Sequence, residues 1–130
     1  VQHCPRIDPL HQSLVYPSQR GESMVGVHDR ANDVLTKLIS QVERNDTQNK
    51  IKHVVIFTHA ATLIAMGRAL TNDPDLPIRS GTCSIGKYKR VLNAKDQRGG
   101  LGIWEQTMNG ETSFLEGGEE RHWGFSYIVG

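Results

Sequence analysis

One histidine stands at a position where α/β proteins bind anions. His59 follows the apolar, β-branched run at residues 53–58 and precedes a helical pattern that starts at Ala60. This order predicts a strand, a tight turn and a helix, with the imidazole where the strand ends. Ligands gather at the carboxyl ends of strands, and helix N-termini favour anions. Phosphate or oxyanion binding is therefore one interpretation of His59, and a half-buried polar residue that caps the helix is the other.

The two residues after the histidine favour the anion interpretation. Ala60 and Ala61 are small, so an anion can approach their backbone N–H groups closely. With His59 they form the predicted phosphate-binding set. Arg79 and Glu22 are further candidates on the substrate side. Their alternatives are a surface arginine and a carboxylate that interacts favourably with a helix dipole.

The elements around His59 alternate as they do in layered α/β proteins. Residues 1–20 are rich in proline and are predicted to be irregular. A long helix is predicted after the N-cap Ser23, and its apolar face recurs at helical spacing: Val27, Ala31, Val34, Leu35, Leu38, Ile39 and Val42. The strand at 53–58 and a helix over 60–70 then complete a helix-strand-helix core that spans residues 21–76.

The remainder, residues 77–130, is predicted to be a strand and hairpin region. Residues 83–91 form a candidate strand, although the alternation of apolar and polar residues is imperfect. Two further apolar runs, at 103–108 and 112–115, flank an Asn-Gly pair at 109–110. Both turn residues tolerate positive φ, so this pattern predicts a β-hairpin.

The composition is that of a globular domain. Its 130 residues are 37% hydrophobic and 22% charged, with a formal net charge of +1. That length can bury a core, and that charge gives no case for binding nucleic acid or an anionic membrane. One basic group is interpreted as a solvated strand face: Lys87, Lys89, Arg90, Lys95 and Arg98. No run is long enough to span a membrane, and two cysteines, Cys4 and Cys83, favour an intracellular chain.

Several of these segments resemble one superfamily. The strand-Thr-His-Ala-Ala-helix pattern around His59 resembles the second catalytic histidine motif of the histidine phosphatase (phosphoglycerate mutase-like) superfamily, and residues 21–23 resemble its Gly-Glu-Ser/Thr segment. Within that superfamily, three later segments resemble the fungal small tau subunits of transcription factor TFIIIC. These are residues 78–84, 107–115 and 118–120, the last of them followed by Trp123.

The resemblance implies that residues 1–130 are the C-terminal half of a three-layer α/β/α domain with a mostly parallel sheet, here with a β-hairpin added. In that superfamily a first histidine, in an Arg-His-Gly motif, attacks phosphorus, and a second one stabilises the phosphoryl group. His59 matches the second histidine, and Arg-His-Gly does not occur in this chain. The whole protein is therefore expected to hydrolyse phosphate monoesters, whereas this chain alone is expected to be inactive.

Other residues are poor substitutes for the missing nucleophile. Four other histidines are candidates by residue type alone: His3, His11, His28 and His53. His28 lies in the first predicted helix and is expected to be solvated. A metal site at His3, Cys4, His11 and Cys83 lacks zinc-type spacing, so neither a metal nor a cofactor is expected.

Two functions from different classes follow from the resemblance. The first is a phosphatase that acts on a phosphate-containing small molecule or a phosphopeptide, in the cytoplasm. The second is a non-catalytic scaffold or interaction subunit of TFIIIC, in the nucleus, within the RNA polymerase III machinery. In either case residues 54–57 are expected to lack a neighbouring strand. The chain is therefore expected to be poorly soluble, to dimerise along that edge or to bind the absent N-terminal half.

Overall fold

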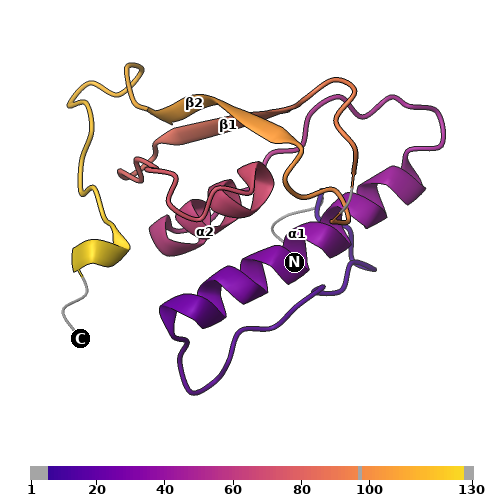
Figure 1. The fold of residues 1–130 in the computed structure, drawn as a ribbon, viewed down its shortest axis with the longest axis horizontal. Helices are drawn as coiled ribbons and strands as arrows, with labels where there is room; N and C mark the ends of the chain where they lie inside the picture. The colour runs from indigo at the N-terminus through magenta and orange to yellow at the C-terminus, as the bar shows by residue number, and fades with distance from the viewer. Residues whose placement is uncertain (1–5, 97, 128–130) are drawn as a thin grey trace.

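Two helices and a two-stranded antiparallel sheet make up the regular structure, which we describe from a computed structural model (Figure 1). The structure describes residues 6–96 and 98–127. In chain order the elements are α1 (Met24–Asn45), α2 (Ala60–Thr71), β1 (Ile85–Arg90), β2 (Trp104–Glu111) and the 3-10 helix η1 (Phe125–Tyr127). The described part of the chain is thus a small mixed α/β fold, and it contains no parallel sheet.

Helix α1 begins where the sequence predicts. The Ser23 hydroxyl accepts a hydrogen bond from the backbone N–H of Gly26 at 3.0 Å, which satisfies a donor that the first turn leaves free. At the other end the Asp46 carboxylate accepts hydrogen bonds from the N–H groups of Lys50 and Ile51, at 2.7 and 3.0 Å. These bonds hold the turn that leads the chain away from the helix.

Helix α2 lies between α1 and the sheet, and the core forms around it (Figure 1). Buried Leu35 of α1 and Ala69 of α2 meet Leu101, which comes from the loop before β2. Partly buried residues complete the cluster: Ile39, Met66 and Leu70. The helix ends at Thr71, and the left-handed φ of 54° at its C-cap Asn72 stops the α-helical hydrogen-bond pattern.

The sheet corrects the predicted hairpin. The strand expected at 83–91 is confirmed as β1, but β2 continues through Asn109 and Gly110 instead of turning there. Ile85 pairs with Glu111 and Lys87 with Met108, so two residues of β2 oppose one residue of β1. The Asn-Gly pair therefore forms a β-bulge. Gly110 does adopt a positive φ, 66°, but it does so at a bulge within β2 and not in a turn between two strands.

The prediction of a strand at residues 53–58 is also wrong. No strand forms there, and no backbone hydrogen bond among the described residues involves residues 52–58. The side chains of Val55 and Phe57 are 75% and 94% exposed. The reason is physical: a strand needs a neighbour to satisfy its backbone groups, and the sheet in the described part of the chain consists of β1 and β2 alone, with no strand beside residues 53–58.

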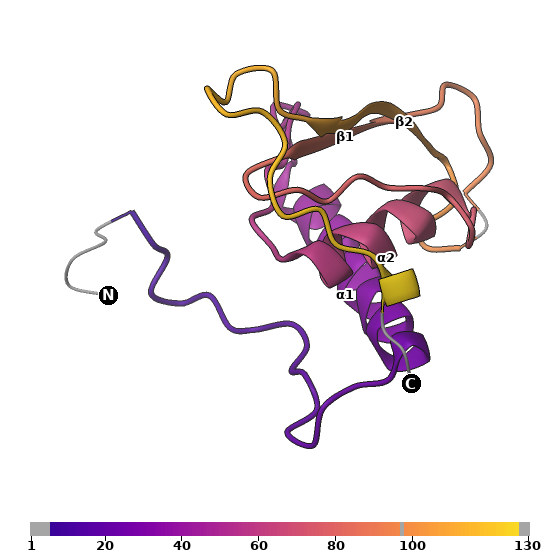
Figure 2. The ribbon, with the colours of Figure 1, turned by 90° about the vertical axis from the view of Figure 1, so that its left-hand side faces the viewer.

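The N-terminal and C-terminal segments differ in how they lie against the helices and the sheet. Residues 6–20 contain no helix or strand, as predicted, and Figure 2 shows this segment running away from the sheet. The segment that follows β2 instead passes back along α2 to η1 (Figure 2). None of the described helices is long and apolar enough to cross a membrane.

Candidate functional site

His59 is the N-cap residue of α2, as the sequence predicts. Its backbone is extended, with φ −107° and ψ 165°, and its carbonyl accepts the hydrogen bond of Leu63 N–H at 2.9 Å. The imidazole makes no capping hydrogen bond and is exposed, so the interpretation as a half-buried cap is wrong. The N–H groups of the first turn, which include those of Ala60 and Ala61, have no acceptor within the helix. An anion can reach this position, and whether it binds one stays a prediction.

The two predicted substrate-side residues are engaged elsewhere. The single Nε–H of Arg30 is shared between the two carboxylate oxygens of Glu22, each at 2.9 Å, and both side chains are partly buried. This ion pair lines a groove of about 580 Å³ between residues 15–23 and the first turns of α1. His59 is not among the residues that line it. Glu22 therefore joins the residues just before α1 to the second turn of that helix.

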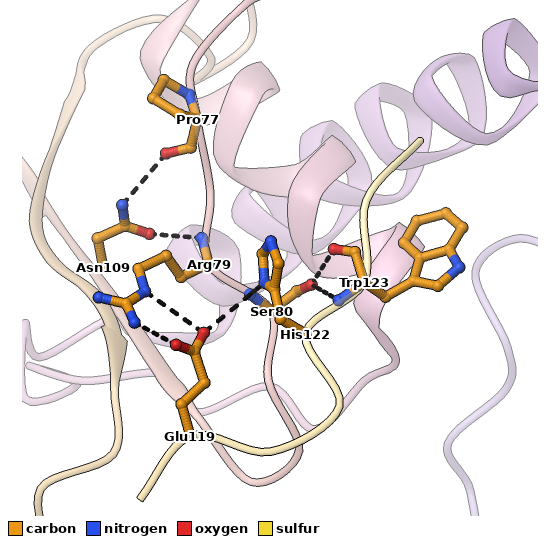
Figure 3. A network of polar contacts seen from close by, with 7 residues as sticks. All are labelled: Pro77, Arg79, Ser80, Asn109, Glu119, His122 and Trp123. Atoms are coloured by element: carbon orange, nitrogen blue, oxygen red, sulfur yellow. Dashed lines mark hydrogen bonds and ion pairs between the residues drawn. The ribbon is translucent and has the colours of Figure 1, made fainter. Parts of the chain in front are cut away.

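Arg79 forms an ion pair with Glu119, 40 residues later in the chain (Figure 3). This pairing raises the pKa of the Arg79 guanidinium and lowers the pKa of the Glu119 carboxyl, and in both the side-chain hydrogen bond is the largest cause. The backbone N–H of Arg79 also donates to Oδ1 of Asn109 at 2.8 Å. Arg79 thus links the loop before β1 to β2 and to the C-terminal segment.

Neighbouring residues extend this link into what we call the tail clasp: Arg79, Ser80 and Thr82 of the loop with Glu119, Glu120, His122 and Trp123 of the C-terminal segment. Figure 3 shows all of these except Thr82 and Glu120. Buried Ser80 donates from its hydroxyl to the carbonyl of Trp123 and accepts from the N–H of the same residue. Thr82 N–H donates to the Glu120 carbonyl at 2.7 Å. Because backbone groups supply several of these bonds, residue types alone did not reveal the clasp.

His28 is partly buried and has partners within the chain, so the prediction of a solvated side chain is corrected. Its Nδ1 lies 2.7 Å from the carbonyl of Met24, and its Nε2 lies 3.2 Å from Nη1 of Arg68. A carbonyl only accepts and a guanidinium only donates, so the two contacts fit the imidazole tautomer with its hydrogen on Nδ1. Its ring also packs against Phe125 of η1, with 5.1 Å between centroids. His28 is therefore a packing residue between α1, α2 and the C-terminal segment.

The remaining chemical candidates do not form a site. His11, His53 and Cys83 are exposed, and His3 and Cys4 lie outside the described residues. Across residues 6–96 and 98–127, no group of three or more His, Cys, Asp or Glu side chains could hold a metal ion. In that same part of the chain, the side chains of Glu22 and Arg79 bond to Arg30 and Glu119 and not to His59 or the residues next to it. The structure does not assemble the predicted residues into one pocket.

The basic group has mixed surroundings. Lys87 and Lys89 are exposed on the outer side of the sheet, in line with a solvated face. Arg90 instead donates to Glu43 of α1 at 3.0 Å and lies over the ring of Trp104. Arg98 donates to the side chain of Asn72. Two of these five cations therefore hold the sheet and its loops against the helices.

Comparison with known proteins shows a similarity to a transcription factor subunit. No protein-family model matches the chain. The transcription factor tau 55 kDa subunit of Saccharomyces cerevisiae is 30% identical to this chain in an alignment 139 residues long. The alignment covers 90% of this chain and 32% of the yeast protein. The chain thus spans about a third of the length of the curated relative that it matches. The expected resemblance to tau subunits is confirmed as sequence similarity, and neither comparison identifies the histidine phosphatase superfamily.

Proposed function

We propose that this chain is a non-catalytic interaction module of a transcription factor subunit related to the tau 55 kDa subunit, and that it acts in the nucleus. The observation that carries the proposal is the similarity over 90% of the chain. Its partners are then the other subunits of that transcription factor, TFIIIC. The module is one portion of a larger α/β domain, with residues 1–20, 21–76 and 77–130 as its parts.

The use of the polar side chains supports a structural role. Arg79 and Glu22 would be available to a substrate if they had no partners, but each forms an ion pair within the chain. Of the predicted site, the His59 imidazole then has only the backbone N–H groups at the start of α2 beside it. An imidazole and a few N–H groups can bind an anion, but they include no second group to attack phosphorus or protonate a leaving group.

A second candidate function rests on one specific observation, the uncapped and exposed His59 at the start of α2. In this proposal the whole protein hydrolyses phosphate monoesters, within a three-layer α/β/α domain. The His59 imidazole and the N–H groups of Ala60 and Ala61 would stabilise the transferring phosphoryl group. The attacking histidine would have to come from outside this chain, because no Arg-His-Gly is present.

One experiment separates the two candidates. The whole protein, tagged and expressed in its own cells, is purified in its native form and as His59→Ala. An interaction module retains the other transcription factor subunits in both forms, as quantified by mass spectrometry, and neither form hydrolyses p-nitrophenyl phosphate. A phosphatase shows turnover that the substitution abolishes. Recovery of the protein without any transcription factor subunit would contradict the main proposal.

A further inference from the structure

The Asn-Gly pair in the bulge of β2 is chemically labile. In an Asn-Gly sequence the glycine nitrogen can attack the preceding side-chain amide with little obstruction, because glycine has no Cβ. Asparagine is for such reasons among the thermolabile residues of proteins. Asn109 is exposed, so water can reach its side chain. The pair therefore has what spontaneous deamidation requires, and its surroundings decide whether the reaction occurs.

Both polar atoms of the Asn109 side chain are bound to the loop that precedes β1. Its Nδ2 donates to the carbonyl of Pro77 at 3.2 Å, and its Oδ1 accepts from the backbone N–H of Arg79 at 2.8 Å (Figure 3). Deamidation requires the side-chain carbonyl carbon to turn toward the nitrogen of Gly110. That movement carries both polar atoms away from their partners, so both hydrogen bonds must break. The folded loop therefore opposes the reaction.

The packing of the bulge requires both residues of the labile pair. A Cβ at Gly110 would collide with the side chain and the backbone of Arg79. Gly110 also has a φ of 66°, which other residues adopt only at a cost. Position 109 must supply a donor to Pro77 and an acceptor to Arg79, and the short amide of asparagine has both. A less labile pair would therefore lose either the close approach or the two hydrogen bonds.

We propose that Asn109 is a deamidation site which its bonds to Pro77 and Arg79 protect, and that its deamidation loosens the tail clasp. In this reaction the Gly110 nitrogen forms a bond to Cγ of Asn109. The proton of that nitrogen and the Nδ2 amine leave together as ammonia, which closes a five-membered succinimide. One water molecule then opens the ring. The products are aspartate and isoaspartate, in which the main chain runs through the side-chain carbonyl.

Either product disturbs the contact between β2 and the loop. An ionised aspartate has no donor for the Pro77 carbonyl, so two acceptors face each other where a hydrogen bond was. Isoaspartate lengthens the main chain at the bulge, where Gly110 packs closely against Arg79. Arg79 carries the ion pair to Glu119, so displacement of the loop weakens the tail clasp. The loss of ammonia makes this change one-way.

The first test follows deamidation of the whole protein in mildly alkaline buffer, with and without urea, by mass spectrometry of tryptic peptides. The peptide of residues 99–121 contains one asparagine, Asn109. It should convert at least about 10-fold more slowly in the folded protein, because reaction there requires local opening. The peptide of residues 91–95 is the internal control. Its Asn93 is also exposed but precedes Ala94, so it should convert slowly in both conditions.

The second test measures the consequence by hydrogen exchange. Thr82 N–H donates to the Glu120 carbonyl, so its exchange reports closure of the tail clasp. Asn109→Asp should speed exchange at residues 79–84 by about 10-fold or more, and the matched control Asn93→Asp should leave it unchanged.

Three results would overturn the proposal: equal conversion of Asn109 with and without urea, conversion in urea no faster than that of Asn93, or equal exchange at residues 79–84 in the two variants. The first test needs no substitution, so it stands whether or not Asn109→Asp folds. Neither test involves a partner subunit or a substrate, so the proposal is independent of the function proposed above.

Discussion

Two of the segments predicted to be strands, residues 53–58 and 83–91, have opposite outcomes, and the one with the weaker pattern forms the strand. Residues 54–57 are uniformly apolar and mostly β-branched, whereas β1 carries three cations among its six residues. β1 nevertheless pairs with β2 over its whole length, and residues 52–58 have no backbone hydrogen bond. The comparison teaches that strand propensity measures how well a side chain packs against residues of adjacent strands. Where no adjacent strand is present, a high propensity does not produce a strand.

The two regions also differ in how they are held to the rest of the chain. The sheet and its loops are held by the tail clasp, by the Arg90 ion pair with Glu43 and by the fit of α2 against Tyr88. The stretch at 52–58 is held at its two ends, by the hydrogen bonds to Asp46 and by the start of α2. Substitutions in the two regions should therefore differ in their effect on the free energy of unfolding.

The largest difference is expected between a core side chain and an exposed one. Leu35 is 2% exposed and lies in the cluster with Ala69 and Leu101. Leu35→Ala should lower the free energy of unfolding by about 2–5 kcal/mol, because it removes buried apolar contacts and leaves a cavity. Phe57→Ala, although it deletes a larger side chain, should change it by less than about 0.5 kcal/mol. Urea unfolding followed by circular dichroism measures both, and a large loss for Phe57→Ala would show that the stretch is packed.

The second comparison concerns glycines with positive φ. A Cβ at Gly110 would collide with the side chain and backbone of Arg79, whereas a Cβ at Gly118 would meet nothing within 4 Å. Gly118→Ala should cost about 1–2 kcal/mol, the strain of left-handed backbone. Gly110→Ala should cost about 1–3 kcal/mol more, because the loop and β2 must also separate. Equal unfolding free energies for the two variants would mean that the bulge does not press against Arg79.

The third comparison tests the contact between α2 and the sheet. A Cβ at Gly67 would overlap Tyr88 and Ile78, while a Cβ at Gly26 would have an ordinary contact of 3.4 Å with Ser23. Gly26→Ala should stabilise the chain by up to about 1 kcal/mol through helix propensity. Gly67→Ala should destabilise it by about 1–2 kcal/mol in thermal or urea unfolding, since overpacking exceeds the same gain. Stabilisation by both variants would show that the sheet can move away from α2.

The smallest expected effect is the pH dependence of the tail clasp. The Arg79 guanidinium lowers the pKa of the Glu119 carboxyl below its ordinary value of 4.5. A lowered pKa in the folded state means that the stabilisation is present above the ordinary value and is lost as the pH falls through the lowered one. The midpoint of urea unfolding should therefore fall with acidification below pH 4.5, and it should fall less in Glu119→Gln. Parallel profiles for the two proteins would exclude a contribution from this ion pair.

The helices were predictable because their signals are local. Ser23 caps α1 through a bond to a residue three positions later, and the run of residues after His59 folds into α2 with one residue more than expected. The hairpin prediction failed because an Asn-Gly pair permits positive φ without specifying its use. Asn109 and Gly110 meet the loop at Pro77 and Arg79, a contact across about 30 residues that no local pattern encodes.

The candidate site divides in the same way. The position of His59 at the start of α2 follows from the order of residue types around it, because an apolar run followed by small helix-forming residues specifies where a helix begins. The roles of Arg79 and His28 depended on partners distant in the sequence, Glu119 and Arg68. Glu22 pairs with Arg30, only eight residues later. Sequence alone thus determined the helix starts, the irregular first segment and the place of one histidine. Tertiary structure decided which strand pattern became a strand and which charges were free, because strands and ion pairs exist only once a partner is beside them.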